Sequence, residues 1–396
     1  MDNHEATIIL NCLPGIGPAR VTRLLMGFGE PAAILRASAG ELTAVPGIGE
    51  VLARTIAGWE KTVDLQRELG LAERAGVRIL TRQDAEYPRR LTEIHDPPLC
   101  LYVRGPEGAL DRLDRSLAIV GSRHTTPYGC LMAETLATAA AQAGWSVVSG
   151  LARGIDTVAH QAVVNAHGCT VAVLGSGLGR IYPQENLNLA RRLVEEGGAL
   201  VSEFPMAYPA DKGTFPMRNR LIAGMTLGTV VVEAGLQSGS LITAGQALEQ
   251  GRAVFAVPGR VDNPQARGCH ALLKDGARLV ESFSDVLDEL LALPGFQAEL
   301  RTPQRAASGS AAPAPRAAAG GAPETEPDPF AGMPFSELER RIVDWLRPRG
   351  ETAIDDLVAG LNEAASKVLG ALLGLELRHV VSQLPGRRAT LRRTLG

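Results

Sequence analysis

The segment DKGTFPMRNR gathers side chains that could bind a nucleic acid. It contains Lys212, Phe215, Arg218, Asn219 and Arg220. Cations attract phosphate groups and aromatic rings stack on bases, which is the chemistry that holds single-stranded nucleic acids. The segment therefore predicts a surface that binds bases and phosphates together.

The same side chains have a structural alternative. The Phe215 ring could belong to the core, and Asn219 could cap the helix that follows. Either arginine could form an ion pair with Glu203 or Glu233, two carboxylates that follow apolar segments. The sequence leaves both interpretations open, residue by residue.

Two Gly/Ser loops each follow an apolar segment and precede a helical one. A loop in this position points backbone N–H groups and a helix N-terminus at its ligand, and both favour anions. The candidate residues in these loops are Gly121, Ser122, Arg123, Ser238 and Gly239.

Two further patterns favour structure over chemistry. GSGLGR, from Gly175, resembles a dinucleotide fingerprint, but Arg180 stands where the last glycine is required. Asp156 and His160 are four residues apart and share a helix face. They could be an acid/base pair, but no nucleophile with an evident partner accompanies them, so we expect them to bind backbone and fill a polar gap. No Walker A lysine pattern occurs, and we expect no cofactor.

Regular alternation of apolar and helical stretches positions these loops. Strands are expected near 117–120, 146–149, 170–174, 199–202, 229–233 and 253–257, and a further one at 99–103. This alternation predicts an α/β fold with a parallel sheet and helices on both faces. The loops would then converge at the carboxyl edge of the sheet.

Composition divides the chain into four segments. We expect a helical SAM-like/helix-hairpin-helix domain at 1–80, the parallel-sheet domain at 81–293, a flexible Ala/Pro/Gly linker at 294–334 and a winged helix at 335–396. The first contains the repeated hairpin motif PGIG, which could hold a DNA phosphate or only pack the domain. Glu50, beside the second hairpin, would repel a phosphate.

The C-terminal segment gives a mixed signal for DNA. Its expected recognition helix, 362–375, contains Lys367 but mainly Ala, Leu, Gly and Glu, whereas groove-reading helices expose basic and amide side chains. Basic residues gather instead at Arg387, Arg388, Arg392 and Arg393. Duplex reading by this helix, a phosphate contact by the wing and contact with a protein all remain open.

The overall composition is that of a globular protein without general attraction to polyanions. The 396 residues are 45% hydrophobic and 21% charged, with a formal net charge of −3. Nucleic-acid binding would therefore require a local basic groove. The five cysteines are scattered, without metal spacing. No run is long enough to span a membrane and no secretory signal is evident, so we expect a cytoplasmic protein.

Taken together, the motifs resemble the DNA-processing protein A (DprA/Smf) family. The resemblance covers roughly 85–290 and includes AIVGSRHTTPYG, VVSGLARGIDTVAH, FPMRNRLIAG and VVVEAGLQSGSLITAG in consistent order. It implies an extended Rossmann-like domain used without a dinucleotide, and a homodimer. It also implies a protein that binds and protects single-stranded DNA and loads the RecA recombinase during natural transformation.

The resemblance also assigns residues. Gly121, Ser122, Arg123, Lys212 and Phe215 match positions that contact DNA, whereas Arg218, Asn219, Arg220, Ser238 and Gly239 match motifs that contact DNA or maintain the pocket. One departure is Gly268-Cys269-His270, where the family commonly has Gly-Asn.

Two other classes of function compete with a non-enzymatic DNA-binding protein. A nucleotide phosphoribohydrolase on a similar fold would use Glu233 and Glu203 as its carboxylates. A transcriptional regulator would act through the winged helix.

Overall fold

The computed structural model describes residues 1–292 and, nearer the C-terminus, 337–349, 352–361, 380–384 and 388–391, with Val368, Leu372 and Leu375. The chain divides into two compact units, Met1–Ala306 and Ala307–Gly396. The predicted linker at 294–334 lies outside the described residues.

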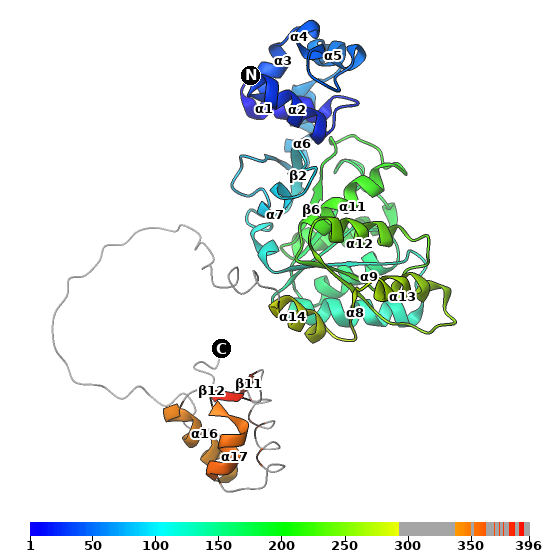
Figure 1. The fold of residues 1–396 in the computed structure, drawn as a ribbon. Helices are drawn as coiled ribbons and strands as arrows, with labels where there is room; N and C mark the ends of the chain where they lie inside the picture. Colours follow the sequence, from blue (N-terminus) through cyan, green and yellow to red (C-terminus); the bar gives the residue numbers. More distant parts are fainter. Residues whose placement is uncertain are drawn as a thin grey trace, which may run out of the picture. The chain divides into compact units, whose positions relative to one another are not determined.

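Short helices form the N-terminal part of the first unit, blue in Figure 1. They are α1 (Asn3–Cys12), α2 (Pro18–Phe28), α3 (Pro31–Arg36), α4 (Ala39–Thr43), α5 (Glu50–Ala57) and α6 (Leu65–Arg74). Both PGIG motifs form turns between helices, ending at the N-cap residues Gly17 and Gly49. Gly15 and Gly47 have φ values of 74° and 84°, in the left-handed region that glycine tolerates best.

A nine-stranded sheet in the order β1-β2-β6-β5-β4-β3-β7-β8-β9 forms the centre of this unit. The strands are β1 (Arg78–Thr81), β2 (Cys100–Arg104), β3 (Ser116–Val120), β4 (Ser146–Ser149), β5 (Thr170–Val173), β6 (Ala199–Ser202), β7 (Gly228–Val231), β8 (Ala253–Ala256) and β9 (Arg278–Leu279). From β6 to β9 every neighbouring pair is parallel. The predicted parallel sheet is confirmed.

The edge of the sheet differs from the prediction. β2 pairs antiparallel with β6, and β1 pairs antiparallel with β2. The sequence predicts a strand at 99–103, which corresponds to β2, but it predicts neither its antiparallel direction nor β1. Strand direction depends on pairing with residues about a hundred positions away, which an apolar run does not specify.

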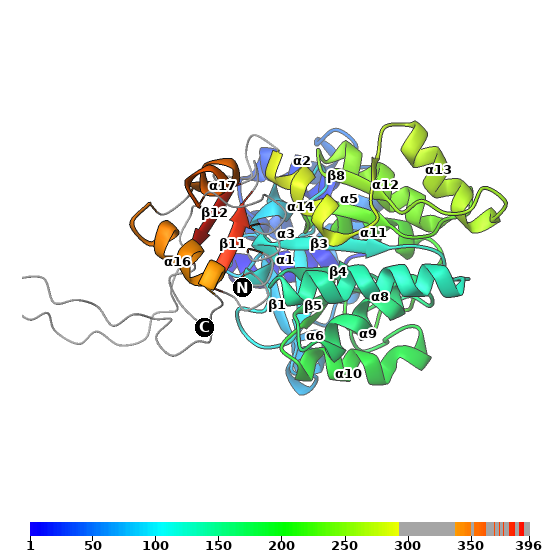
Figure 2. The same ribbon diagram turned by 90° about the horizontal axis from the view of Figure 1, so that it is seen from below.

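Helices cover both faces of the sheet, as Figure 2 shows. On one side lie α8 (Pro127–Gln142), α9 (Ile155–Asn165) and α10 (Leu187–Glu195), and on the other α11 (Thr214–Gly224), α12 (Gly239–Glu249) and α13 (Arg267–Lys274). Consecutive β3 residues alternate between the two layers. Leu117 packs in the core with α8 and α9, and Ala118 in the core with α11 and α12. Burial on both faces explains the continuous apolar run of β3.

Two short helices complete the sheet unit: α7 (Arg89–Thr92) and α14 (Phe283–Ala292). α7 packs against α11 and α14 against α8.

The N-terminal helices share a hydrophobic core with the sheet. One cluster of buried side chains runs from α1 through Tyr102 in β2 to α10. The Asn11 amide donates to the Glu203 carbonyl at 3.0 Å, and the Glu68 carboxylate accepts from the Met206 N–H at 2.7 Å. Helices and sheet are therefore packed together and hydrogen-bonded to the chain that follows β6.

The second unit contains a small three-stranded sheet. Its elements are α16 (Glu337–Arg349), β10 (Thr352–Ala353), α17 (Ile354–Leu361), β11 (Val381–Leu384) and β12 (Arg388–Leu391), with sheet order β10-β12-β11. Ile342, Leu346 and Leu357 lie in its core. Most of the expected recognition helix at 362–375, and Arg387, Arg392 and Arg393, lie outside the described residues. Among the helices of the described segments, none is long and apolar enough to cross a membrane.

Candidate nucleic-acid interface

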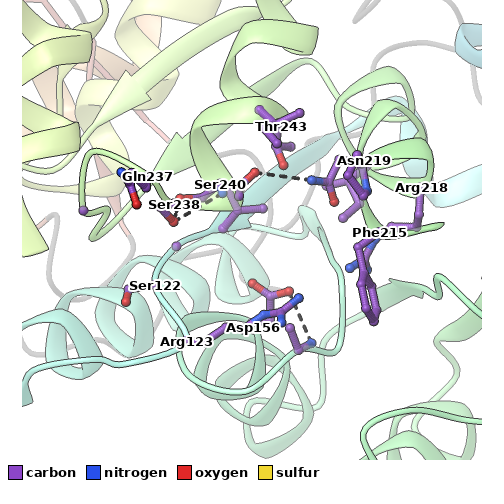
Figure 3. A pocket seen from close by; sticks show the side chains of 18 of the residues that line it. Ser122, Arg123, Asp156, Phe215, Arg218, Asn219, Gln237, Ser238, Ser240 and Thr243 are labelled. Atoms are coloured by element: carbon purple, nitrogen blue, oxygen red, sulfur yellow. Dashed lines mark hydrogen bonds between the residues drawn. The ribbon is translucent and has the colours of Figure 1, made fainter. Parts of the chain in front are cut away.

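A cavity of about 580 Å³ opens at the carboxyl ends of β3, β4 and β7. The chain runs from β3 outward through β4 and β5 to β6, and then returns to β7 on the other side of β3. This reversal leaves a crevice at the strand ends, where open α/β sheets bind ligands. Figure 3 shows side chains from both sides of the reversal directed around one space. The predicted convergence of the loops is confirmed.

The loop after β3 is tightly packed. A Cβ at Gly121 would lie 2.6 Å from Ile155 Cγ1 and 2.9 Å from the Glu233 carbonyl. The Ser122 N–H donates to that carbonyl at 2.7 Å, and its hydroxyl donates to the His124 carbonyl at 2.9 Å. These bonds engage the Ser122 N–H and hydroxyl within the protein and shape the loop that presents Arg123. Ser122 lines the cavity, and its contact with a phosphate stays a prediction.

The first turn of α11, with Lys212 just before it, forms the opposite wall. The Thr214 hydroxyl donates to the Gly175 carbonyl at 2.5 Å, which fixes the first turn of α11 against the β5 loop. Phe215 lies over the same glycine, since a Cβ at Gly175 would lie 2.9 Å from the ring. The ring is half-buried, and Lys212 is exposed at the rim. Arg123 reaches across, with its Cζ 5.1 Å from the Phe215 ring centroid.

Arg218 places a buried positive charge against the cavity. Its guanidinium donates to the Val173 carbonyl and lies where a Cβ at Gly150 would collide. Burial lowers the pKa of Arg218 to about 10, although Asp156 opposes the shift. A cation held in so little water attracts an anion strongly, because water does not screen the charge.

Asp156 and His160 bind the framework around this cation. Asp156 accepts from the N–H groups of Gly150 and Ala152, at 3.1 and 3.3 Å, and burial raises its pKa. His160 bonds the Thr170 hydroxyl in β5 at 2.7 Å. These contacts confirm the structural interpretation of the pair. Asp156 also lines the cavity, which the sequence did not predict.

The N-terminus of α12 closes the third side. Ser238 is its N-cap, and the Ser238 hydroxyl lies 2.7 Å from that of Ser240. The backbone at Gly239 is open, since a Cβ there would meet no atom within 4 Å. Asn219 donates to the Gly239 carbonyl at 3.3 Å and thereby links α11 to α12, an arrangement different from the helix cap considered for it. The positive end of the α12 dipole therefore faces the cavity.

Arg220 is not brought to the cavity. Its guanidinium forms a 2.5 Å ion pair with Glu203, and both side chains are almost completely shielded from solvent. For Arg220 the structural alternative holds. The other predicted residues line the cavity together with residues that the sequence did not single out. These are Val120, His124, Ala152, Pro216, Ile222, Gly235, Gln237, Ile242 and Gln265.

The GSGLGR loop does not cradle a phosphate here. The N–H groups of Gly177 and Gly179 donate to the carbonyls of Tyr208 and Met206, at 2.9 and 3.0 Å. A Cβ at Gly177 would lie 1.9 Å from the Pro205 carbonyl oxygen. These glycines therefore allow two loops to pack together, and they leave no dinucleotide site at this position.

Comparison with known proteins agrees with this architecture. A family model described as DNA recombination-mediator protein A matches residues 78–291. The chain belongs to this family. A model of the SAM-like helix-hairpin-helix tandem matches residues 9–57, and a model of the DprA winged helix domain matches residues 312–387. The resemblance seen in the sequence is confirmed, as are the three kinds of domain.

Known relatives match more than half of this chain. Protein Smf of Escherichia coli is 40% identical over 311 residues, 78% of this chain and 75% of the relative. DNA processing protein DprA of Bacillus subtilis is 42% identical over 226 residues, 57% of this chain and 75% of the relative. The solved structure of DprA from Streptococcus pneumoniae has a TM-score of 0.63 and 32% identity, covering 73% of this chain and 98% of that one.

Both carboxylates considered for catalysis are engaged in this family member. Glu233 accepts from the Thr126 N–H at 2.9 Å and from its hydroxyl at 2.6 Å, which fixes the N-cap of α8. Glu203 pairs with Arg220. Neither lines the cavity. Both therefore hold the loops that frame it.

Proposed function

We propose that this protein is a non-enzymatic mediator of recombination that binds single-stranded DNA in the cavity at the β3/β7 reversal. One observation carries the proposal: Arg123, Lys212, Arg218 and the α12 N-terminus surround the same space as the Phe215 ring. Cations and a helix N-terminus suit phosphates, and an aromatic ring suits a base. Single-stranded DNA offers phosphates and unpaired bases in alternation along its whole length, whatever its base sequence.

Each group has a distinct role in the proposed mechanism. Lys212 and Arg123, both exposed at the rim, neutralise successive phosphates. Arg218 and the Gly239 turn, deeper in the cavity, hold one phosphate where water is scarce. Phe215 stacks on a base. Since phosphates and ring faces occur at every nucleotide, binding should show little sequence preference.

The biological role extends this proposal. We infer that the protein protects incoming single strands and loads RecA on them during natural transformation, and that it acts as a homodimer in the cytoplasm. Membership of the recombination-mediator family supports this role. Sedimentation velocity tests the dimer, and the lag before RecA nucleates on single-stranded DNA tests loading. An unchanged lag on adding the protein would contradict the loading role.

The winged helix is proposed to add contact with duplex DNA. Its family model supports a domain of the right kind. Removing 335–396 should then lower affinity for duplex more than for single strands. Unchanged duplex affinity would contradict this contact and also the regulator alternative.

Retention of fluorescent oligo-dT tests the central proposal. Arg123→Glu and Lys212→Glu each reverse a charge at the rim and should weaken binding strongly. Arg191→Glu and Lys274→Glu are matched controls, because both residues are exposed and lie outside the cavity lining. Equal affinity of all four variants would refute the DNA-binding cavity. Nucleotide turnover that disappears in Glu233→Ala would favour the phosphoribohydrolase alternative.

A further inference from the structure

Phe215 separates the cavity from a second, smaller recess. Tyr182 and Pro183 line the far side of this recess, whereas Arg123 and Arg218 line both spaces. The Phe215 ring is therefore a shared wall. A strand that leaves the cavity over this ring meets Tyr182 next, in the loop after β5.

Tyr182 presents part of its aromatic ring to solvent. The residue is 43% exposed, although its ring contacts another ring. The Tyr182 and Phe215 centroids are 5.8 Å apart, with an angle of 45° between the ring planes. The two rings are too close together, and too strongly tilted, for a base to insert between them. Instead, each ring has an outer face that is available to a base, and these two faces are inclined to one another.

The loop that carries Tyr182 is held in place before any ligand binds. The Ser176 hydroxyl donates to the Arg180 carbonyl at 2.8 Å, which closes the loop on itself. The bonds from Gly177 and Gly179 to the 206–208 segment fix the loop from the other side. An exposed ring on a fixed loop loses little conformational freedom on binding, which favours a recognition role.

The charge of Arg153, which also lines the recess, is compensated. Arg153 forms a two-pronged ion pair with Glu185, at 2.5 and 2.9 Å, and both side chains are more than half exposed. A phosphate near Arg153 would also meet the Glu185 carboxylate. Arg153 therefore offers little uncompensated charge beside Tyr182.

We propose that Tyr182 is a second stacking platform, so that consecutive bases of one strand lie against Phe215 and Tyr182. This inference rests on the proposed single-strand function. The inference gives the bound strand a direction, because the strand then leaves the cavity toward the loop that follows β5. It also makes stacking, and not charge, the contribution of this part of the surface.

Two variants and two ligands test the platform. Tyr182→Ala removes the ring and Tyr182→Phe keeps it; the ligands are oligo-dT and an oligonucleotide of equal length with abasic sites. Tyr182→Ala should weaken oligo-dT binding by roughly tenfold, the scale of one stacked base, whereas Tyr182→Phe should bind like wild type. The loss should vanish on the abasic strand, and the salt dependence should not change, because no phosphate contact is removed.

The outcomes separate this inference from the function beneath it. Equal affinity of Tyr182→Ala and wild type for oligo-dT, or an equal loss on both ligands, overturns the platform alone. Oligo-dT binding that is indifferent to Lys212→Glu overturns the proposed function itself. If Tyr182→Ala unfolds, Tyr182→Trp replaces it. The fluorescence that the new tryptophan adds to that of the wild type should be quenched by oligo-dT and not by the abasic strand. Equal quenching by the two ligands would overturn the proposed stacking on residue 182.

Discussion

Arg220 donates to the carboxylate of Glu203 across 2.5 Å, in a site where the two side chains are 12% and 7% exposed. Burial raises the pKa of Glu203 even with this cation beside it. The pair joins α11 to the segment after β6, which in turn contacts α1 through Asn11. A residue expected to contact DNA therefore connects three parts of the fold.

Arg220→Ala should reduce stability more than DNA binding. Breaking a buried pair leaves one charge without a partner and typically costs about 3–5 kcal/mol, reduced here to the extent that Glu203 takes up a proton. Urea unfolding measures the loss, and Arg220→Ala/Glu203→Ala should recover part of it. A large drop in oligo-dT affinity at unchanged stability would instead restore Arg220 as a DNA contact.

Lys212→Ala should reduce the salt dependence of binding. Each phosphate neutralised on a single strand contributes about 0.7 to the slope of log K against log salt concentration, so the slope should fall by about that amount. Anisotropy titrations of oligo-dT at several salt concentrations measure it. Lys274→Ala is the matched control and should leave the slope as in wild type. A weaker affinity with the original slope would mean that Lys212 does not hold a phosphate.

Gly175→Ala should weaken binding without changing any charge. The new Cβ would lie 2.9 Å from Phe215 and displace the ring from its position. Affinity for oligo-dT should fall by up to about the tenfold that one stacked base contributes. Gly245→Ala is the control, because a Cβ there meets nothing within 4 Å and alanine favours a helix interior. Normal affinity of Gly175→Ala would exclude a stacking role for Phe215 in its present position.

His160 should make the fold sensitive to acid. The Thr170 hydroxyl donates to the Val147 carbonyl, so His160 donates from Nδ1 to Thr170 as a neutral ring. Burial, with the Arg218 charge, lowers the His160 pKa from 6.5 to about 3. Within that window the unfolded chain binds the proton and the folded chain does not. Stability is therefore complete above the unfolded pKa and is lost as the pH falls through the window, by up to about 1.4 kcal/mol per pH unit.

His160→Gln provides the comparison, because its amide can still donate to Thr170. Urea midpoints between pH 4 and pH 7 should vary less in this variant than in wild type. If the urea midpoint changed equally with pH in the two proteins, the acid sensitivity would come from a residue other than His160.

The sequence predicts the parallel sheet and the meeting of its loops because both follow from short-range patterns. Apolar strands such as 117–120 are recognisable on their own, and the carboxyl ends of parallel strands must share an edge. The engagement of Ser122 is not predictable in this way. Its N–H partner is the carbonyl of Glu233, more than a hundred residues away.

Helix geometry could have separated the two arginines. Arg218 and Arg220 are two positions apart on α11, which places them about 200° apart around the helix axis. If one of these two arginines lines the cavity, the other must therefore point away from it. The sequence alone does not say which, because that depends on how α11 packs on the sheet. Tyr182 carried no signal of its own, since its exposure results from the packing of its loop.

The core shared by α1, β2 and α10 bears on how the hairpins should be studied. Helices and sheet should melt in a single calorimetric transition, because neither can separate without exposing the buried side chains of the other. A protein shortened to begin at β1 would expose apolar surface around Tyr102 and tend to aggregate, which would mimic a loss of DNA binding. Point substitutions at Gly17 or Gly49 keep that cover and are the cleaner probe of the hairpins.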